Sequence, residues 1–218
     1  MVTSRLLNSI PGIRHGFGCA AALVPPVLEN MWSLRPVKRQ VHGTHVAPVE
    51  LPEQAVGEAD GFVTAVAGLP VSVITADCVP LLLARRDATQ VAAVHAGWRG
   101  LYDGIIPAAL AEMGEGAPIA AAVGPTICVE CYEVSEELAN DFAGKFGPSA
   151  VPAFRHLDLR AIAEQQLRAA GVEEIEHVGG CTCCTCDAAG EPIYRSYRRG
   201  DRGSQMHSGL YITSQETT

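Results

Sequence analysis

Residues 71–100, VSVITADCVPLLLARRDATQVAAVHAGWRG, decide the fold of this chain. Two apolar runs in this stretch, residues 71–74 and 91–94, are short, rich in β-branched side chains and bounded by turn signals, which is typical of buried strands. Cys78 follows the first run and His95 ends the second. We therefore expect Cys78 and His95 to lie at neighbouring strand ends, an arrangement that can form a site.

The flanking sequence predicts strands on both sides of this stretch and helices mainly after it. Upstream we expect a turn into a short strand within 10–18 that carries His15, a hairpin over 37–49 with His42 and His45 near its tip, and the end of a loop leading into a short strand within 57–65. Downstream we expect a helix over 100–113, a strand at 119–123, helices capped by Ser135 and Asp158, and strands at 175–178 and 210–213. This irregular alternation favours an α+β, or mixed α/β, domain with sheets flanked by helices.

Composition narrows the class of protein. A length of 218 residues favours one domain, residues 1–218, and 48% hydrophobic residues favour a globular protein. The formal net charge of −8 argues against a nucleic-acid partner, because such binding depends on clustered basic residues. We find neither an apolar run long enough for a membrane span nor a signal peptide, so we expect a soluble cytoplasmic protein.

Eight cysteines in a cytoplasmic protein favour metal binding or catalysis over a disulfide framework, because the cytosol keeps thiols reduced. His42, Cys78 and His95 offer two imidazoles and one thiolate, which suit zinc. Three protein ligands with a fourth position left open is the pattern of catalytic zinc, whereas structural zinc is closed by four. The three residues lie on separate elements, so ordinary strand-end positions are the alternative.

The same residues support a competing chemistry without metal. Cys78, activated by His95, could act as a thiolate nucleophile in acyl transfer or amide hydrolysis. A thiolate bound to zinc is a poorer nucleophile, so the two interpretations exclude each other, and metal analysis separates them.

Other candidates concern anion binding and the unusual cysteine run. Arg99 follows the strand that carries His95, and a late basic loop could bind phosphate or carboxylate; a solvated loop is the alternative. The basic residues of that loop are Arg195, Arg198, Arg199 and Arg202. The CTCCTC run contains Cys181, Cys183, Cys184 and Cys186. It could bind Cu(I) or zinc, yet its spacing is poor for one tetrahedral ion, so incidental thiols are as good an explanation.

Five segments together resemble the laccase-domain or YfiH-like family in order and spacing. They are QVHG at 40–43, TADCVPLLL at 75–83, VHAGWRG at 94–100, GPTICVECYEV at 124–134 and SYRR at 196–199. Members of this family are described as polyphenol oxidoreductases, purine nucleoside phosphorylases and peptidoglycan editing factors. The resemblance runs from about His15 to the C-terminus.

The resemblance implies a fold, a metal and a reaction. The fold is two packed mixed sheets covered by helices, shared with the catalytic domain of cytotoxic necrotizing factor. The metal is zinc held by His42, Cys78 and His95. The reaction is phosphorolysis of purine nucleosides such as adenosine, inosine and methylthioadenosine, with adenosine deamination as a companion activity. The substrate or phosphate would then meet Gln40, Arg99, Arg198 and Arg199.

Two alternative functions and three departures from the family pattern stay open at this point. Cytotoxic necrotizing factor, which shares this fold, uses a Cys–His deamidase dyad. A Cys–His amidohydrolase that edits peptidoglycan precursors is therefore the first alternative. A copper-dependent polyphenol oxidase comes second, because several coppers need many histidines and this chain has seven. The departures are a shortened segment between His15 and Gln40, Ser204 in place of the usual Arg, and the extra cysteines of the CTCCTC run. A purely metal-binding or partner-binding domain without turnover is the non-enzymatic alternative.

Overall fold

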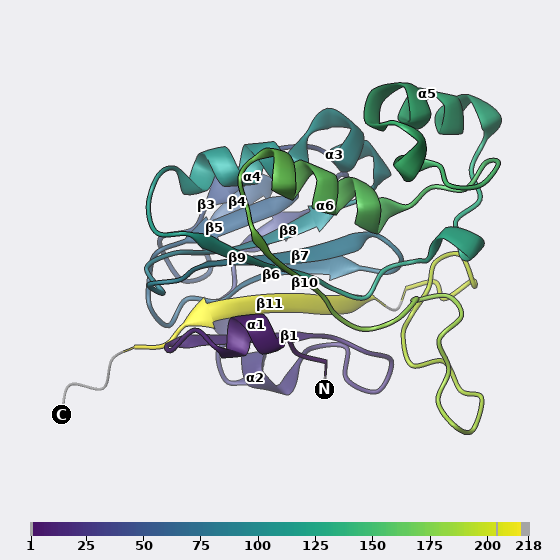
Figure 1. Cartoon of the computed structure of the whole chain (residues 1–218). Coiled ribbons are helices and arrows are strands. Elements are labelled where there is room, and N and C mark those ends of the chain that lie inside the picture. The colour runs from purple at the N-terminus through teal and green to yellow at the C-terminus, as the bar shows by residue number, and fades with distance from the viewer. Residues whose placement is uncertain (1, 204, 215–218) are drawn as a thin grey trace.

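The computed structural model describes residues 2–203 and 205–214, so Ser204 lies outside the described residues. A six-stranded mixed sheet with strand order β10-β9-β7-β8-β5-β3 forms its centre (Figure 1). These strands are β3 (Val46–Pro48), β5 (Gly61–Thr64), β7 (Val79–Arg85), β8 (Val91–Ala96), β9 (Ile119–Val123) and β10 (Glu174–His177).

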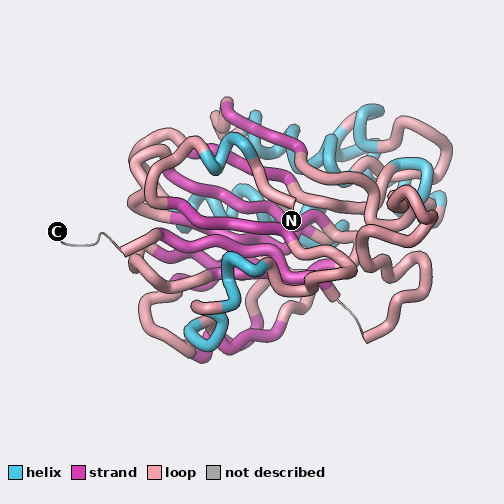
Figure 2. The backbone as a smooth tube through the Cα atoms, turned by 90° about the horizontal axis from the view of Figure 1, so that it is seen from below, coloured by secondary structure: helices cyan, strands magenta, loops and turns pink. Residues whose placement is uncertain are grey.

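A smaller antiparallel sheet covers one face of the central sheet. Its strands, in the order β1-β11-β6, are β1 (Ile13–Phe17), β11 (Met206–Ile212) and β6 (Val71–Thr75). Seen from below, the strands of the two sheets run in roughly the same direction, as in aligned sheet packing (Figure 2). A third, two-stranded sheet pairs β2 (Val37–Arg39) with β4 (Ala55–Glu58) in parallel.

Helices cover the other face of the central sheet (Figure 1). They are α3 (Trp98–Asp103), α4 (Ile105–Met113) and α6 (Leu159–Ala169), with α5 (Glu136–Phe146) farther out. Two short helices border the small sheet, α1 (Arg5–Asn8) and α2 (Pro26–Glu29). The short 3-10 helices are η1 (Trp32–Leu34), η2 (Val129–Cys131) and η3 (Pro148–Ala150). None of the helices in the described part of the chain combines the length and the apolar character that a membrane crossing requires.

Strand β7 shows why the sequence folds into these layers. Leu81 and Leu83 belong to the core beneath the helices, whereas Leu82 and Ala84 belong to the core between the sheets. Successive strand residues point to opposite faces, so a strand buried on both faces reads as a continuous apolar run. The predicted mixed α/β architecture of two packed sheets flanked by helices is confirmed.

The capping predictions are also confirmed. The Ser135 hydroxyl accepts the N–H of Leu138 at 3.2 Å at the start of α5, and Asp158 accepts the N–H of Ala161 at 2.9 Å at the start of α6. The helix expected over 100–113 is instead two helices, because Gly104 between them adopts a left-handed φ of 94°.

One prediction about strand pairing is wrong. The expected hairpin over 37–49 does not form, since β2 pairs with β4 and β3 pairs with β5 in a different sheet. The apolar run at 71–74 forms β6, which pairs with β11. Cys78 reaches His95 because it immediately precedes β7, whose first residue, Val79, pairs with Ala96 of β8.

Candidate metal and active site

His42, Cys78 and His95 converge at one end of the central sheet. One ligand atom from each residue lies within 4.8 Å of the other two. The antiparallel pairing of β7 with β8 brings Cys78 next to His95, and the loop between β2 and β3 supplies His42. His42 has a left-handed φ of 62°, and its ring packs edge-on against His95 with the centroids 4.7 Å apart.

Asp60, immediately before β5, positions both imidazoles. Its carboxylate is fully buried and lies 2.7 Å from Nδ1 of His95. The same carboxylate accepts the backbone N–H groups of Val41, His42 and Gly43 at 3.0, 2.9 and 2.8 Å. A hydrogen bond from Nδ1–H to a carboxylate leaves Nε2 of His95 free to act as a metal ligand or a base.

The electrostatics of these groups are strongly coupled. Burial alone would raise the pKa of the Cys78 thiol, but the neighbouring His95 and His42 lower it to about 6. Burial alone would lower the pKa of His95, yet the Cys78 thiolate and Asp60 raise it to about 9. Burial also opposes ionisation of Asp60, and the hydrogen bonds from His95 and the backbone outweigh it and lower the pKa of Asp60. Without metal, the site therefore favours a thiolate beside an imidazolium.

Gly97 leaves room for an ion or a substrate atom among the three side chains. A Cβ at this position would lie 2.9 Å from Cδ2 of His42 and 3.1 Å from Sγ of Cys78. The mixed nitrogen and sulfur donors, the carboxylate behind His95 and this close approach fit a zinc ion held by three residues.

A cavity of about 680 Å³ opens onto these ligands. This volume suits a small-molecule ligand. Its walls combine three aromatic side chains with polar groups. The lining residues are Gln40, His42, Ile74, Thr75, Ala76, Asp77, Cys78, His95, Trp98, Tyr132, Tyr197, Arg198 and Gln205.

Two of the predicted binding residues, Gln40 and Arg198, line this cavity. Gln40 donates to the carbonyl of Ile74 at 2.8 Å and accepts the N–H of Ile74 at 2.7 Å, so its amide holds β6 in place. The backbone N–H of Arg198 donates to Asp77 at 2.7 Å. Its guanidinium donates to the carbonyls of Cys131 and Glu133 and lies over the ring of Tyr132.

Comparison with known proteins identifies the family of the chain. Residues 28–212 match the family described as multi-copper polyphenol oxidoreductase laccase. The chain belongs to this laccase-domain family. The resemblance seen in the sequence is therefore confirmed.

Named relatives of this laccase-domain protein include enzymes of nucleoside metabolism. A purine nucleoside phosphorylase of Streptomyces coelicolor is 40% identical over 173 residues, which cover 73% of this chain and 67% of the relative. An adenosine deaminase from an unknown prokaryotic organism is 34% identical over 193 residues, covering 79% and 73%.

Solved structures share the fold of this laccase-domain protein. YlmD from Geobacillus stearothermophilus superposes with a TM-score of 0.77 at 26% identity, covering 94% of this chain and 93% of that one. A Neisseria meningitidis protein gives a TM-score of 0.79 at 24% identity, covering 98% and 99%.

The other two predicted binding residues, Arg99 and Arg199, do not line the cavity. Arg99 is exposed, and its guanidinium lies 4.9 Å from the ring centroid of Trp98. Arg199 instead ties the late loop together, donating to the carbonyls of Thr182 and Cys183 and to Asp201.

The remaining five histidines of the laccase domain lie elsewhere. His15 accepts the N–H of Ser4, and His207 packs against Trp32. The other three are engaged by Glu58, Phe154 and Glu164; they are His45, His156 and His177. A copper ion at this site would therefore have two imidazole ligands, His42 and His95.

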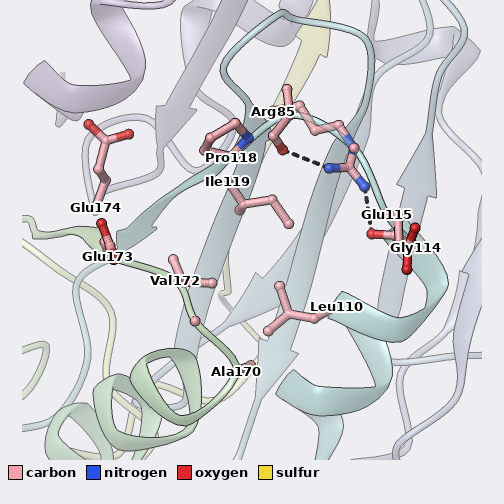
Figure 3. Close-up of a pocket in the computed structure, with 13 residues that line it drawn as sticks. Arg85, Leu110, Gly114, Glu115, Pro118, Ile119, Ala170, Val172, Glu173 and Glu174 are labelled. Atoms are coloured by element: carbon pink, nitrogen blue, oxygen red, sulfur yellow. Dashed lines mark hydrogen bonds between the residues drawn. The ribbon is translucent and has the colours of Figure 1, made fainter.

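A second cavity, of about 780 Å³, lies at the far end of β7 from Cys78 (Figure 3). Its buried cation, Arg85, donates to Gln90 and to the carbonyls of Ala117, Met113 and Gly114. Figure 3 shows the guanidinium bonded to the backbone at Gly114 rather than offered to the cavity. We place the candidate chemistry at the smaller cavity, because His42, Cys78 and His95 line it.

Sequence reasoning missed three residues of the site. Asp60 reads only as part of a turn before Gly61, and nothing in its spacing points to His95. Gly97 reads as part of a strand-to-helix loop. Asp77, beside Cys78, is buried with a left-handed φ of 91°. The sequence signal that could have pointed to Asp77 was its position next to Cys78, a candidate metal ligand.

Proposed function

We propose that this protein is a zinc-dependent purine nucleoside phosphorylase that acts on adenosine, inosine and methylthioadenosine, with adenosine deamination as a companion activity. The observation that carries the proposal is the convergence of His42, Cys78 and His95 on a cavity with aromatic walls. The names of the relatives support the choice of substrate. Free thiols at all eight cysteines are consistent with the reducing cytoplasm as the site of action.

His42, Cys78 and His95 would hold the zinc ion, which supplies a Lewis acid that polarises a substrate oxygen or water. The rest of the chemistry belongs to the chain. Asp60 keeps the proton of His95 on Nδ1, so that Nε2 faces the site. Buried and hydrogen-bonded, Asp60 also fixes the loop that carries His42.

Phosphorolysis requires two substrates to meet in this cavity. A phosphate oxygen forms a bond to C1′ of the ribose, the bond from C1′ to the purine nitrogen breaks, and the purine leaves with the electron pair and takes up a proton. The rings of Trp98, Tyr132 and Tyr197 can stack on the purine, and Arg198 can orient the phosphate. Holding both reactants in line supplies much of the rate.

The direct test is incubation of the full chain with inosine, phosphate and zinc. We expect hypoxanthine and ribose 1-phosphate, and no product when phosphate is omitted. The His42→Ala variant should lose this activity, whereas His45→Ala should keep it, because His45 is exposed and does not line the cavity. Absence of hypoxanthine from the zinc-loaded wild type would refute the proposal.

The companion activity has its own test. Adenosine supplied without phosphate should give inosine and ammonia, as water replaces the 6-amino group. Loss of this reaction in His42→Ala would assign it to the same site.

A second candidate function, a Cys–His amidohydrolase that edits peptidoglycan precursors, is favoured by one arrangement. Cys78, His95 and Asp60 also have the order of a nucleophile, a base and an orienting carboxylate. Under this function the metal-free protein would release an amino acid from a nucleotide-linked peptide precursor, phosphate would be irrelevant, and alkylation of Cys78 would abolish turnover. Loss of activity on zinc removal separates the first function from the second.

A further inference from the structure

Four cysteines outside the candidate active site gather in a second cluster beside it. Cys128 immediately precedes the 3-10 helix η2 and Cys131 is its last residue, whereas Cys181 and Cys184 lie in the loop after β10. One sulfur atom from each lies within 4.8 Å of the other three. A parallel bridge between Thr126 and Cys181 joins the two segments.

The distances match a tetrahedral metal site and not a disulfide. Four sulfurs at the zinc–sulfur distance of about 2.3 Å are separated by roughly 3.8 Å in a tetrahedron. The sulfurs of Cys128 and Cys184 are 3.9 Å apart. A disulfide would bring two sulfurs to about 2.05 Å, and every cysteine of the chain is free.

The spacing also has the form of a structural zinc site. Cys128 and Cys131 form one Cys-x₂-Cys pair, and Cys181 and Cys184 form a second, far along the chain. Cys183 and Cys186, which belong to the same CTCCTC run, stay outside the cluster. The run therefore contributes two ligands rather than four, which resolves the difficulty of its tight spacing.

Backbone hydrogen bonds favour a thiolate at Cys181, and two guanidinium groups lie close to the cluster. The sulfur of Cys181 accepts the backbone N–H groups of Cys128 and Cys183 at 3.2 and 3.3 Å. Zinc with four thiolates carries a net charge of −2. The guanidinium groups of Arg198 and Arg199 bind the carbonyls of Cys131 and Cys183, so two cations flank the cluster.

We propose that Cys128, Cys131, Cys181 and Cys184 bind a second zinc ion, as a closed structural site. Each thiol loses its proton as the ion binds. Four protein ligands leave no position for substrate, in contrast to the three ligands at His42, Cys78 and His95.

The position of the cluster gives this zinc a function. Residues 178–205 contain no helix or strand among those described, and an irregular segment of this length needs tertiary ties. Thr182, between two of the ligands, donates to the carboxylate of Asp77 at 2.6 Å, next to Cys78. Tyr132 follows Cys131 and lines the cavity. The second zinc would hold this wall of the cavity in place, a positioning role that rests on the proposed function.

Metal content of the full chain, purified under reducing conditions, tests the site without any activity assay. We expect two zinc ions per wild-type chain, one in Cys184→Ser, one in His42→Ala and none in the double variant. Cys186→Ser is the matched control, because Cys186 is an exposed cysteine two residues farther along, outside the cluster. It should keep both ions.

Cobalt substitution identifies the ligands. In the His42→Ala background, Co²⁺ should give the visible bands of a tetrahedral site and an intense thiolate-to-cobalt charge-transfer band. Adding Cys184→Ser should weaken that band, and adding Cys186→Ser should leave it unchanged. If the cysteine variants do not fold, titration of the wild-type protein with p-hydroxymercuribenzoate replaces them; release of two zinc ions per chain supports the proposal.

Several results would overturn the second site. The first is a single zinc ion per wild-type chain that is lost in His42→Ala and kept in Cys184→Ser. The second is iron or copper, in place of zinc, at the four cysteines. The third is a protein mass that shows disulfides within the cluster although the protein was kept reduced. If the wild type holds two zinc ions but does not phosphorolyse inosine, the proposed function fails while the second site stands. If the wild type phosphorolyses inosine and holds one zinc ion, the proposed function stands and the second site fails.

Discussion

The carboxylate of Asp60 lies 2.7 Å from Nδ1 of His95, and the two side chains are 0% and 3% exposed. The same carboxylate accepts the backbone N–H of His42 at 2.9 Å. One buried acid therefore orients one imidazole ligand through its ring and another through its backbone. A change at Asp60 should therefore disturb both histidine ligands.

Asp60→Asn should weaken zinc binding at His42, Cys78 and His95 by about 10–100-fold. The Asn side chain has one acceptor oxygen, and its NH₂ group would face N–H donors that the carboxylate accepts in the wild type. The proton of His95 would then no longer be held on Nδ1. Competition with a chromophoric chelator measures the affinity. Asp87→Asn is the control, because Asp87 is exposed and its carboxylate accepts from Thr89, away from the candidate site. An unchanged affinity in folded Asp60→Asn would show that the orientation of His95 does not depend on Asp60.

Gly97→Ala should remove most of the metal from the three-ligand site while the protein stays folded. Its φ of −74° suits alanine, so the effect is steric: the new methyl group would lie 2.9 Å from His42 and 3.1 Å from Cys78. Zinc content and thermal denaturation together test this. Gly144→Ala in α5 is the matched control, because a Cβ there meets nothing within 4 Å. It should keep the metal and gain up to about 1 kcal/mol in the free energy of unfolding. A Gly97→Ala protein with full zinc content would contradict the close packing.

Arg198→Ala should raise the KM for phosphate by roughly tenfold or more, since a hydrogen bond to a charged group contributes about 1.5–3 kcal/mol. Arg99→Ala should have a smaller effect, because Arg99 is exposed and does not line the cavity. Steady-state kinetics with inosine at varied phosphate compare the two. A larger effect at Arg99 would move the phosphate position to the start of α3.

His15 should make the protein less stable as the pH falls from about 6.5 to about 4. Burial, partly offset by the charge of Glu176, lowers the pKa of His15 from 6.5 to about 4, and Nε2 of the neutral ring accepts the N–H of Ser4 at 2.8 Å. Between pH 6.5 and 4 the unfolded chain takes up a proton at His15 and the folded protein does not. The contribution of neutral His15 to the free energy of unfolding is therefore fully present above pH 6.5 and is lost as the pH falls toward 4. The loss is on the order of 3 kcal/mol.

Urea denaturation of wild type and His15→Gln across this pH range measures the effect. The variant keeps a side-chain acceptor that does not titrate, so its stability should depend less on pH. The exposed His45→Gln serves as control and should follow the wild type. Burial also lowers the pKa of His207 to about 4, which accounts for the dependence that should persist in His15→Gln. Equal slopes for His15→Gln and wild type would contradict the assignment.

Local patterns carried much of the fold. The apolar runs at 91–94 and 119–123 appear as β8 and β9, and the caps at Ser135 and Asp158 begin α5 and α6. These features depend on interactions within a few residues, which a sequence displays directly. The types of residue also singled out His42, Cys78 and His95, because few other side chains combine the donors that zinc prefers.

Partners far apart along the chain were decided only by the tertiary structure. The hairpin expected over 37–49 fails because its two halves join different sheets, and the order of strands depends on which faces both cores can bury. The pairing of β5 with β8 brings Asp60 to His95, and a bridge between Thr126 and Cys181 brings the Cys128 pair to the Cys181 pair. Alternation and capping are local, whereas strand order is a property of the whole packed chain, and no short pattern encodes it.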